Sequence, residues 1–198
     1  MNKILQKRAL LLSYFTVGYN IVEGILSIGL GLATGSIALV GFGSDSFIES
    51  LSGSIMIWRF TKKFKSVEEE EQVEKRAQKL VAYTFFILGS YVLFESVKDL
   101  LLREPPEPSL FGIIIAILSL IIMPTLTYLK YQTGKKLNSK SLMSDSMQTL
   151  VCVMMSFALL LSLGLNYLFN IWWVDPLAGL VFVIILYREG IEAYKGED

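Results

Sequence analysis

The sequence contains no histidine and a single cysteine, Cys152. Histidine is the commonest ligand for zinc-like metals and the usual group that titrates near neutral pH. A lone cysteine excludes a disulfide within the chain, so cysteine usage says nothing about the redox compartment. Any metal or proton chemistry in this chain therefore depends on carboxylates, amides, hydroxyls, backbone carbonyls and one thiol.

The chain also lacks net charge, because its 18 basic and 18 acidic residues cancel. Nucleic-acid binding proteins usually carry a basic excess, so no nucleic-acid partner is expected. The sequence has no phosphate-binding glycine loop and no pairing of a nucleophile with a base. We therefore expect neither an enzyme nor a resident cofactor.

Apolar residues are abundant: 53% of the chain is hydrophobic, and its mean hydropathy is +0.54. A helix that spans a membrane needs about 20 apolar residues, and the chain offers six segments of this kind. The sequence predicts an all-α membrane protein, a bundle of six transmembrane helices forming a single transmembrane domain over residues 1–198. The expected helices are about 9–33, 36–58, 80–102, 110–130, 141–166 and 171–190.

The basic residues predict the orientation of the bundle. Six helices place both termini and the connections at 59–79 and 130–140 on one side of the membrane. That side holds every lysine and arginine except Lys98 and Arg103, and basic residues mark the cytoplasmic side. We expect a multi-pass integral membrane protein with both termini in the cytoplasm and the lipid bilayer as its surroundings. The compact chain, without a targeting sequence, favours the cytoplasmic (inner) membrane of a bacterium.

Two acids interrupt the 36–58 segment near its middle. Asp45 and Glu49 are four residues apart, so they project from one face of a helix, one turn from each other. A charged carboxylate in lipid costs at least about 2.5 kcal/mol. Neutralisation by protonation or by a basic neighbour is one interpretation of the pair, and a cation site within the membrane is the one we favour.

The 141–166 segment carries a second polar stripe. Asp145, Gln148, Thr149 and Cys152 are spaced by three, four and seven residues, which places them along one side of a helix. Gln148 and Cys152 are expected to meet Asp45 and Glu49 near the middle of the bilayer. Two carboxylates, an amide and a thiol form a ligand set for a divalent transition metal.

Further acids lie on other expected helices. Glu23, near the middle of the 9–33 helix, is a candidate proton carrier, accessory ligand or hydrogen-bond partner in helix packing. Thr149 and Asp145 are further candidates for an accessory or proton-coupling role. Glu95 and Asp99 lie towards the outer end of the 80–102 helix, where they are candidates for a vestibule that attracts cations.

These features resemble the cation diffusion facilitator (cation efflux) family. The resemblance rests on the Gly-Ser-Ile-Ala-Leu start of the 36–58 helix, on GFGSDSFIES and MSDSMQTLVC, and on WWVDPLAGL. It covers nearly the whole chain and is nearest to a short branch that consists of the membrane domain only. It implies that Asp45 and Glu49, with Gln148 and Cys152, occupy the metal positions of the family.

The departures from the family pattern leave the metal and part of the site open. Better-known members have histidine or aspartate and then aspartate where this chain has Gln148 and Cys152. A thiolate favours zinc, cadmium or copper(I), whereas a site without it suits manganese, iron or cobalt. Asp145 is an alternative ligand if its helix is rotated. The cytosolic C-terminal domain usual in the family is not expected here, because few residues follow the last helix, and a homodimer remains a candidate state.

The function that the residues and the resemblance predict is a secondary transporter. It exports divalent transition-metal cations from the cytoplasm, zinc first, with cadmium, cobalt, manganese and iron as further candidates. Proton antiport follows from competition, because metal ligands must be deprotonated and two close carboxylates favour a proton on the empty site. The alternative is a non-transporting membrane partner or regulator of another transporter.

Overall fold

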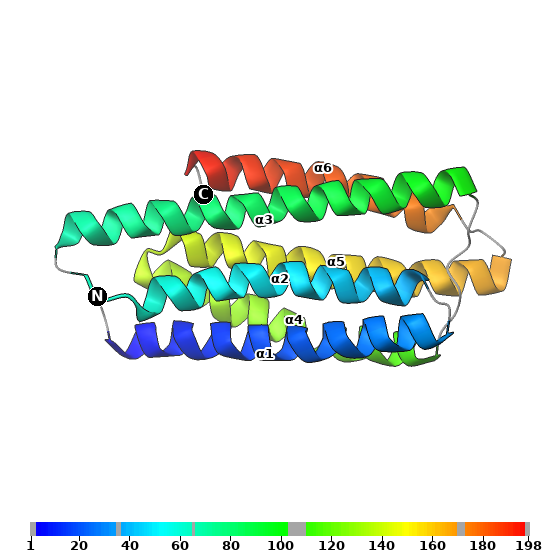
Figure 1. Ribbon diagram of the computed structural model, residues 1–198, viewed down its shortest axis with the longest axis horizontal. Helices are drawn as coiled ribbons and strands as arrows, with labels where there is room; N and C mark the ends of the chain where they lie inside the picture. Colours follow the sequence, from blue (N-terminus) through cyan, green and yellow to red (C-terminus); the bar gives the residue numbers. More distant parts are fainter. Residues whose placement is uncertain (1–2, 35–36, 65, 103–109, 170–172, 197–198) are drawn as a thin grey trace.

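The computed structural model describes residues 3–34, 37–64, 66–102, 110–169 and 173–196. Within these residues the chain forms six helices and no strand, and the helices run side by side along the long axis of the molecule (Figure 1). The all-α, six-helix prediction is confirmed. The helices are α1 (Lys3–Thr34), α2 (Ile37–Thr61), α3 (Val67–Leu102), α4 (Leu110–Leu137), α5 (Lys140–Phe169) and α6 (Val174–Lys195).

Several helices extend beyond their apolar segments. α3 begins at Val67 rather than near residue 80, so much of the expected connection at 59–79 is helix, and α4 continues to Leu137. The apolar run of a membrane helix marks the part that meets lipid, whereas its polar turns can continue into water. The expected helix starts at Ser36 and Ile171, and Arg103, lie outside the described residues.

The run of glutamates that begins at Glu68 lies in the first turn of α3. The backbone N–H of Glu69 donates to the Ser66 hydroxyl at 3.2 Å, as a residue that caps a helix N-terminus does. The first turn carries Glu68, Glu69 and Glu70, whose negative charges favour the positive end of the helix dipole. Hydrogen bonds from its own backbone N–H and from the Ser66 hydroxyl lower the pKa of Glu68.

The helices associate mainly as three antiparallel pairs: α1 with α2, α3 with α6, and α4 with α5. Glycines let the first pair approach closely. A Cβ atom on Gly43 would lie 2.8 Å from the Gly24 carbonyl oxygen, and one on Gly53 would lie 2.7 Å from a Val17 methyl group. Small residues at such contacts are typical of membrane bundles, where close backbone packing drives association.

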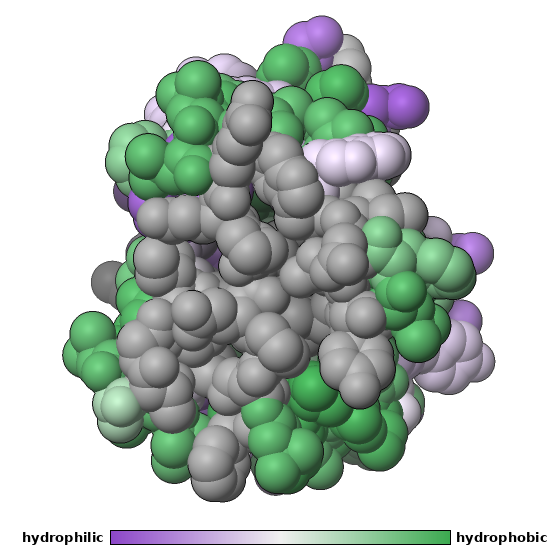
Figure 2. Space-filling model, turned by 90° about the vertical axis from the view of Figure 1, so that its right-hand side faces the viewer, coloured by the Kyte–Doolittle hydropathy of each residue, from purple (hydrophilic) through white to green (hydrophobic). Residues whose placement is uncertain are grey.

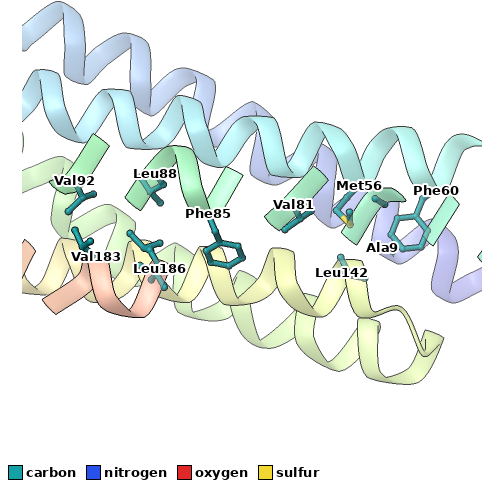
Figure 3. Close-up of a cluster of buried hydrophobic side chains, with 12 residues drawn as sticks. Ala9, Met56, Phe60, Val81, Phe85, Leu88, Val92, Leu142, Val183 and Leu186 are labelled. Carbon is teal, nitrogen blue, oxygen red and sulfur yellow. The ribbon is translucent and has the colours of Figure 1, made fainter. Parts of the chain in front are cut away.

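The apolar core is centred on α3. Phe85, Leu88 and Val92 of α3 lie against Val183 and Leu186 of α6 (Figure 3). Nearer the end of the bundle at which the chain begins, α3 also contacts the starts of α1 and α5 and the end of α2 through the residues Ala77, Val81, Ala9, Met56, Phe60 and Leu142. This core packs α3 against α6 and also joins α3 to α1, α2 and α5.

The surface of the bundle is suited to lipid. Seen from its outer end, the described side chains around the rim are mainly hydrophobic (Figure 2). By length and composition, three segments of the described chain can cross a membrane: Lys3–Ala33, Val67–Leu102 and Ile113–Leu137. α2 and α5 are the two helices that carry the predicted site.

Candidate metal site

The acidic pair lies on α2 as the spacing predicts. Glu49 is almost fully buried, with 1% of its surface exposed, whereas Asp45, one turn closer to the outer end, is partly exposed. One carboxylate oxygen of each, Asp45 Oδ1 and Glu49 Oε1, is buried without a hydrogen-bond partner in the described part of the chain. The two charges act on each other. A buried carboxylate oxygen without a donor is costly, so these oxygens are candidates for contact with a cation.

The α5 residues reach this pair unequally. The Cys152 thiol is close enough to the Glu49 carboxyl group to interact with it, and it also feels the charge of Asp45. Gln148 is fully buried, but its Oε1 accepts a hydrogen bond from the Thr84 hydroxyl of α3 at 2.8 Å. Its Nε2 has no partner among the described residues. Cys152 therefore lies near Glu49, while the amide oxygen of Gln148 is directed towards α3.

The ligands do not form a closed metal cage. Across residues 3–34, 37–64, 66–102, 110–169 and 173–196, no three acidic or cysteine side chains are grouped tightly enough to hold a metal ion as they stand. Ligands in this arrangement bind a metal only if α2 and α5 move closer together or side chains rotate.

Glu23 lies beside the pair, on α1. It is 6% exposed, and both of its oxygens accept hydrogen bonds: one from the Tyr19 hydroxyl at 3.0 Å and one from the Ser46 hydroxyl at 2.8 Å. Glu23 and Glu49 are close enough for their charges to interact. Since both oxygens already have donors, Glu23 is placed next to the site and held away from direct contact with its centre.

The outer acids of α3 face the same region as Asp45. The charges of Asp45, Glu95 and Asp99 all act on the Tyr91 hydroxyl. Glu95 also forms an ion pair with Lys98, with 3.3 Å between Oε2 and Nζ. The charge of Glu95 also acts on Asp45.

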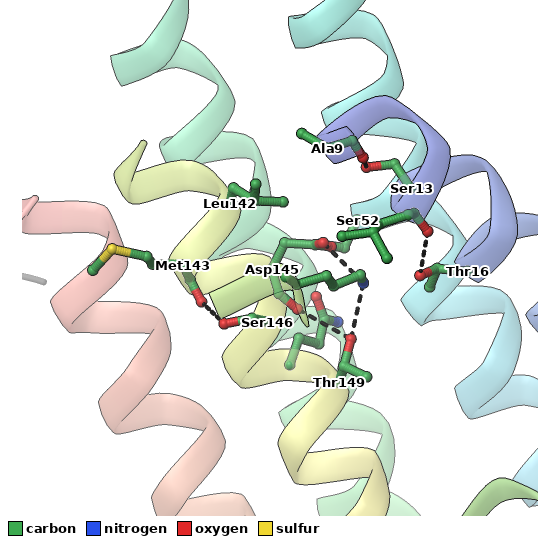
Figure 4. A network of polar contacts seen from close by, with 12 residues as sticks. Ala9, Ser13, Thr16, Ser52, Leu142, Met143, Asp145, Ser146 and Thr149 are labelled. Carbon is green, nitrogen blue, oxygen red and sulfur yellow. Dashed lines mark hydrogen bonds and ion pairs between the residues drawn. The ribbon is translucent and has the colours of Figure 1, made fainter. Parts of the chain in front are cut away.

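Asp145 and Thr149 belong to a separate polar network that also includes Ser52 of α2 (Figure 4). Asp145 Oδ2 lies 2.9 Å from Lys130 Nζ of α4, and both side chains are fully buried. Lys130 also donates to the Thr149 hydroxyl at 3.0 Å, and the Ser52 hydroxyl donates to Asp145 Oδ1 at 2.6 Å. Asp145 is thus neutralised by a lysine and is directed away from the other candidate ligands.

The site predicted from the sequence did not include two buried polar residues, Lys130 and Asn20. Lys130, at the expected end of the 110–130 helix, was counted only as a cytoplasmic positive charge, yet none of its surface is exposed. Asn20 is fully buried, and neither atom of its amide has a partner within the described residues. The contacts of Gly24 with Gly43 and of Val17 with Gly53 place Asn20 at the level of Glu49. The α1 spacing Thr16, Asn20, Glu23 and Ser27 was the available signal for a buried polar stripe.

Fold and site together define a helical membrane protein with an acidic site inside the bundle. The chain belongs to the cation efflux family: residues 14–195 match the cation efflux transmembrane domain.

Relatives occur in distant organisms. The chain is 26% identical over 188 residues to transmembrane protein 163 of Xenopus laevis, which covers 94% of this chain and 66% of that protein. It is 24% identical over 201 residues to the cadmium, cobalt and zinc/H(+)-K(+) antiporter of Bacillus subtilis, covering 98% of this chain and 63% of the antiporter. The chain thus spans between half and two thirds of the length of these curated relatives and of an uncharacterized transporter of Synechocystis, of which it covers 56%.

Proposed function

We propose that this chain exports divalent transition-metal cations from the cytoplasm through a site between α2 and α5. The observation that carries the proposal is the acidic pair inside the bundle: Asp45 Oδ1 and Glu49 Oε1 are buried without a hydrogen-bond partner among the described residues, and Cys152 interacts with Glu49. Acids within a membrane domain commonly mark an ion pathway. The Bacillus subtilis relative is named as an antiporter of cadmium, cobalt and zinc, which agrees with a mixed oxygen and sulfur site.

Proton exchange follows from the same residues. Metal ligands must lose their protons before they bind, so a cation and protons compete for Asp45 and Glu49. A metal arriving from the cytoplasm displaces protons, and protons arriving from outside displace the metal. Gln148 completes the site if its amide releases Thr84, and Glu23, held by Tyr19 and Ser46, takes the accessory proton-coupling role.

Several finer features belong to this proposal. Zinc is the leading substrate, with cadmium, cobalt, manganese and iron as candidates, and Glu95 and Asp99 form an outer vestibule. The proposed direction is export towards the outside of a bacterial cytoplasmic membrane, and the basic residues support the orientation with both termini in the cytoplasm. A homodimer is a candidate assembly.

The test is metal-dependent proton flux in proteoliposomes that contain only this chain. Glu49→Gln and Asp45→Asn are expected to lower the flux about 100-fold or more, because each removes a charged ligand. Glu71→Gln is the matched control, since it makes the same chemical change on an exposed residue of α3. Cys152→Ser is expected to change the order of preference among zinc, cadmium, cobalt, manganese and iron.

The outcomes separate the candidate functions. Flux that survives in both Asp45→Asn and Glu49→Gln would contradict a site on α2. If folded native protein gives no flux with any metal, the alternative is favoured: a membrane partner or regulator of another transporter.

A further inference from the structure

The buried network around Lys130 ties three helices together. Lys130 comes from α4, Asp145 and Thr149 come from α5, and Ser52 comes from α2, and all four side chains are fully buried. Figure 4 shows Asp145 between Ser52 on one side and Thr149 on the other. α2 and α5 otherwise contact each other little, so this network is a main connection between the two helices that carry the candidate site.

The network lies directly on the cytoplasmic side of the site. α2 runs towards the cytoplasm, and Ser52 follows Glu49 by three residues, or about 4.5 Å along the helix axis. α5 runs the opposite way, and Asp145 precedes Gln148 by the same three residues. A cation that moves between the cytoplasm and Glu49 along the space between these helices has to pass the Lys130–Asp145 pair.

A second layer closes the same end of the bundle. Arg59 of α2 is 2% exposed and forms ion pairs with Glu70 and Glu74 of α3. Glu74 Oε1 in turn accepts hydrogen bonds from the Ser139 hydroxyl at 2.8 Å and from the backbone N–H of Ser141 at 2.9 Å. Glu49, Ser52, Asp145 and Arg59 are all buried, whereas Asp45 on the outer side is partly exposed. Two layers of buried ionic contacts therefore lie on the Ser52 side of the acidic pair.

We propose that the Lys130–Asp145 ion pair is the cytoplasmic closure of the cation pathway. In the closed state, the Lys130 ammonium group stands in the pathway and repels a divalent cation, while its pairing with Asp145 leaves no net charge buried. When the pair separates, the pathway opens and the Asp145 carboxylate is presented to a cation that arrives from the cytoplasm.

This inference rests on the proposed transport function, and the competing explanation is a structural clamp. A buried ion pair that only holds helices together can be replaced by neutral side chains of the same shape with little loss. A charge-based closure fails under the same replacement, because the ammonium group that repels the cation is gone and the helices are no longer held by ionic attraction. The double variant Lys130→Met with Asp145→Asn separates these explanations, since it leaves neither charge unpaired.

Cys152 provides the reporter. It is the only cysteine of the chain, and it lies beside Glu49 on the outer side of the network. A membrane-impermeant thiol reagent is applied to oriented vesicles, first from the cytoplasmic side and then from the outside, and the rate of Cys152 labelling is measured. Cys152→Ser is the blank, and the exposed Arg188–Glu192 pair, replaced by Arg188→Gln with Glu192→Gln, is the matched control.

The closure predicts a one-sided change. In the Lys130→Met, Asp145→Asn variant, the rate of labelling from the cytoplasmic side is expected to rise about tenfold or more, because the closed state is no longer favoured over the open state by the ion pair. The rate from the outside is not expected to rise, and the control variant is expected to match the native chain. An unchanged cytoplasmic rate, or equal increases from both sides, would overturn the proposal.

The labelling result is independent of the transport result. Proton flux is measured on the same preparations. If the native protein gives no flux but the double variant still shows the one-sided rise in labelling, the transport function is rejected and the closure is kept. If the native protein gives flux and labelling of the double variant is unchanged, the transport function is kept and the closure is rejected.

Discussion

The interface between α3 and α6 and the space among α1, α2, α4 and α5 bury different kinds of side chain. Phe85 and Leu88 of α3 meet Leu186 of α6 with apolar surfaces on both sides. On the other side of the bundle, the buried groups include Asn20, Glu49, Lys130 and Asp145. An apolar interface in lipid depends on close packing, whereas a polar one depends on which donors and acceptors are paired.

This difference indicates that α3 and α6 form a rigid part of the bundle and that the polar region among the other helices is the part that can rearrange. Packed apolar side chains have one good arrangement, because the interior has little free volume. Paired polar groups can exchange partners with an ion or a proton at modest net cost. We therefore expect α3 and α6 to stay together while α2, α4 and α5 rearrange around the cation, and four predictions test this comparison.

The largest expected loss of stability is in the polar region. Lys130→Met alone should lower the free energy of unfolding by about 3–5 kcal/mol, because it leaves the Asp145 carboxylate buried without its partner. Adding Asp145→Asn should restore most of that loss. Unfolding in mixed detergent micelles measures both variants, and a single variant as stable as the native chain would contradict a buried ion pair at this position.

Phe85→Ala tests the rigid apolar part of the bundle. Phe85 is fully buried, and its truncation leaves a cavity that costs about 2 kcal/mol. The transfer contribution seen in water-soluble proteins is small here, because lipid is as apolar as the core. Proton flux per folded molecule should remain close to native. A large loss of flux in well-folded protein would show that α3 takes part in transport more directly than a rigid part does.

Gly179→Ala tests how tightly α6 packs on α3. A Cβ atom on Gly179 would lie 2.1 Å from the Ser96 hydroxyl oxygen. Because a serine side chain can rotate, the expected loss of stability is about 1 kcal/mol. Gly18→Ala on α1 is the matched control, since nothing lies within 4 Å of the added atom there. It should be neutral or slightly stabilising because alanine favours helix. Equal effects of the two changes would contradict the close α3–α6 contact.

The smallest effect is expected outside the membrane, at the start of α3. The pKa of Glu68 is lowered in the folded chain by hydrogen bonds from its own backbone N–H and from Ser66. A carboxyl group with a lowered folded pKa stabilises the protein above its unfolded pKa and loses that contribution as the pH falls. Glu68→Gln should therefore reduce stability slightly near neutral pH and have no effect in acid. Unfolding measured at both pH values checks this, and a larger effect in acid would have the wrong sign.

Much of the fold could be predicted from local sequence. Long apolar runs separated by charged segments are sufficient to indicate six helices, since length and hydropathy act within each segment. The helix ends were harder to predict. α3 begins at Val67 because its polar first turns are stabilised by Ser66 and the helix dipole rather than by lipid.

The site could be predicted only in part. The i,i+4 spacing places Asp45 and Glu49 on one face whatever surrounds them, and these two remain the centre of the proposed site. Asp145 and Gln148 show the limit of this reasoning, because their spacing gives the α5 face but not the neighbour that each side chain finds. Asp145 pairs with Lys130, and Gln148 accepts from Thr84.

The sequence by itself determined the class of protein, the stripe of polar residues on each helix and the side that carries the basic residues. Helix periodicity and the cost of charge in lipid act within one segment and need no knowledge of its neighbours. Tertiary structure decided which stripes meet: it placed Cys152 beside Glu49, left the Asn20 amide at their level and set Lys130 against Asp145. The physical reason is that lateral packing and vertical register between helices depend on close contacts such as that of Gly24 with Gly43, and these contacts join residues far apart in the chain.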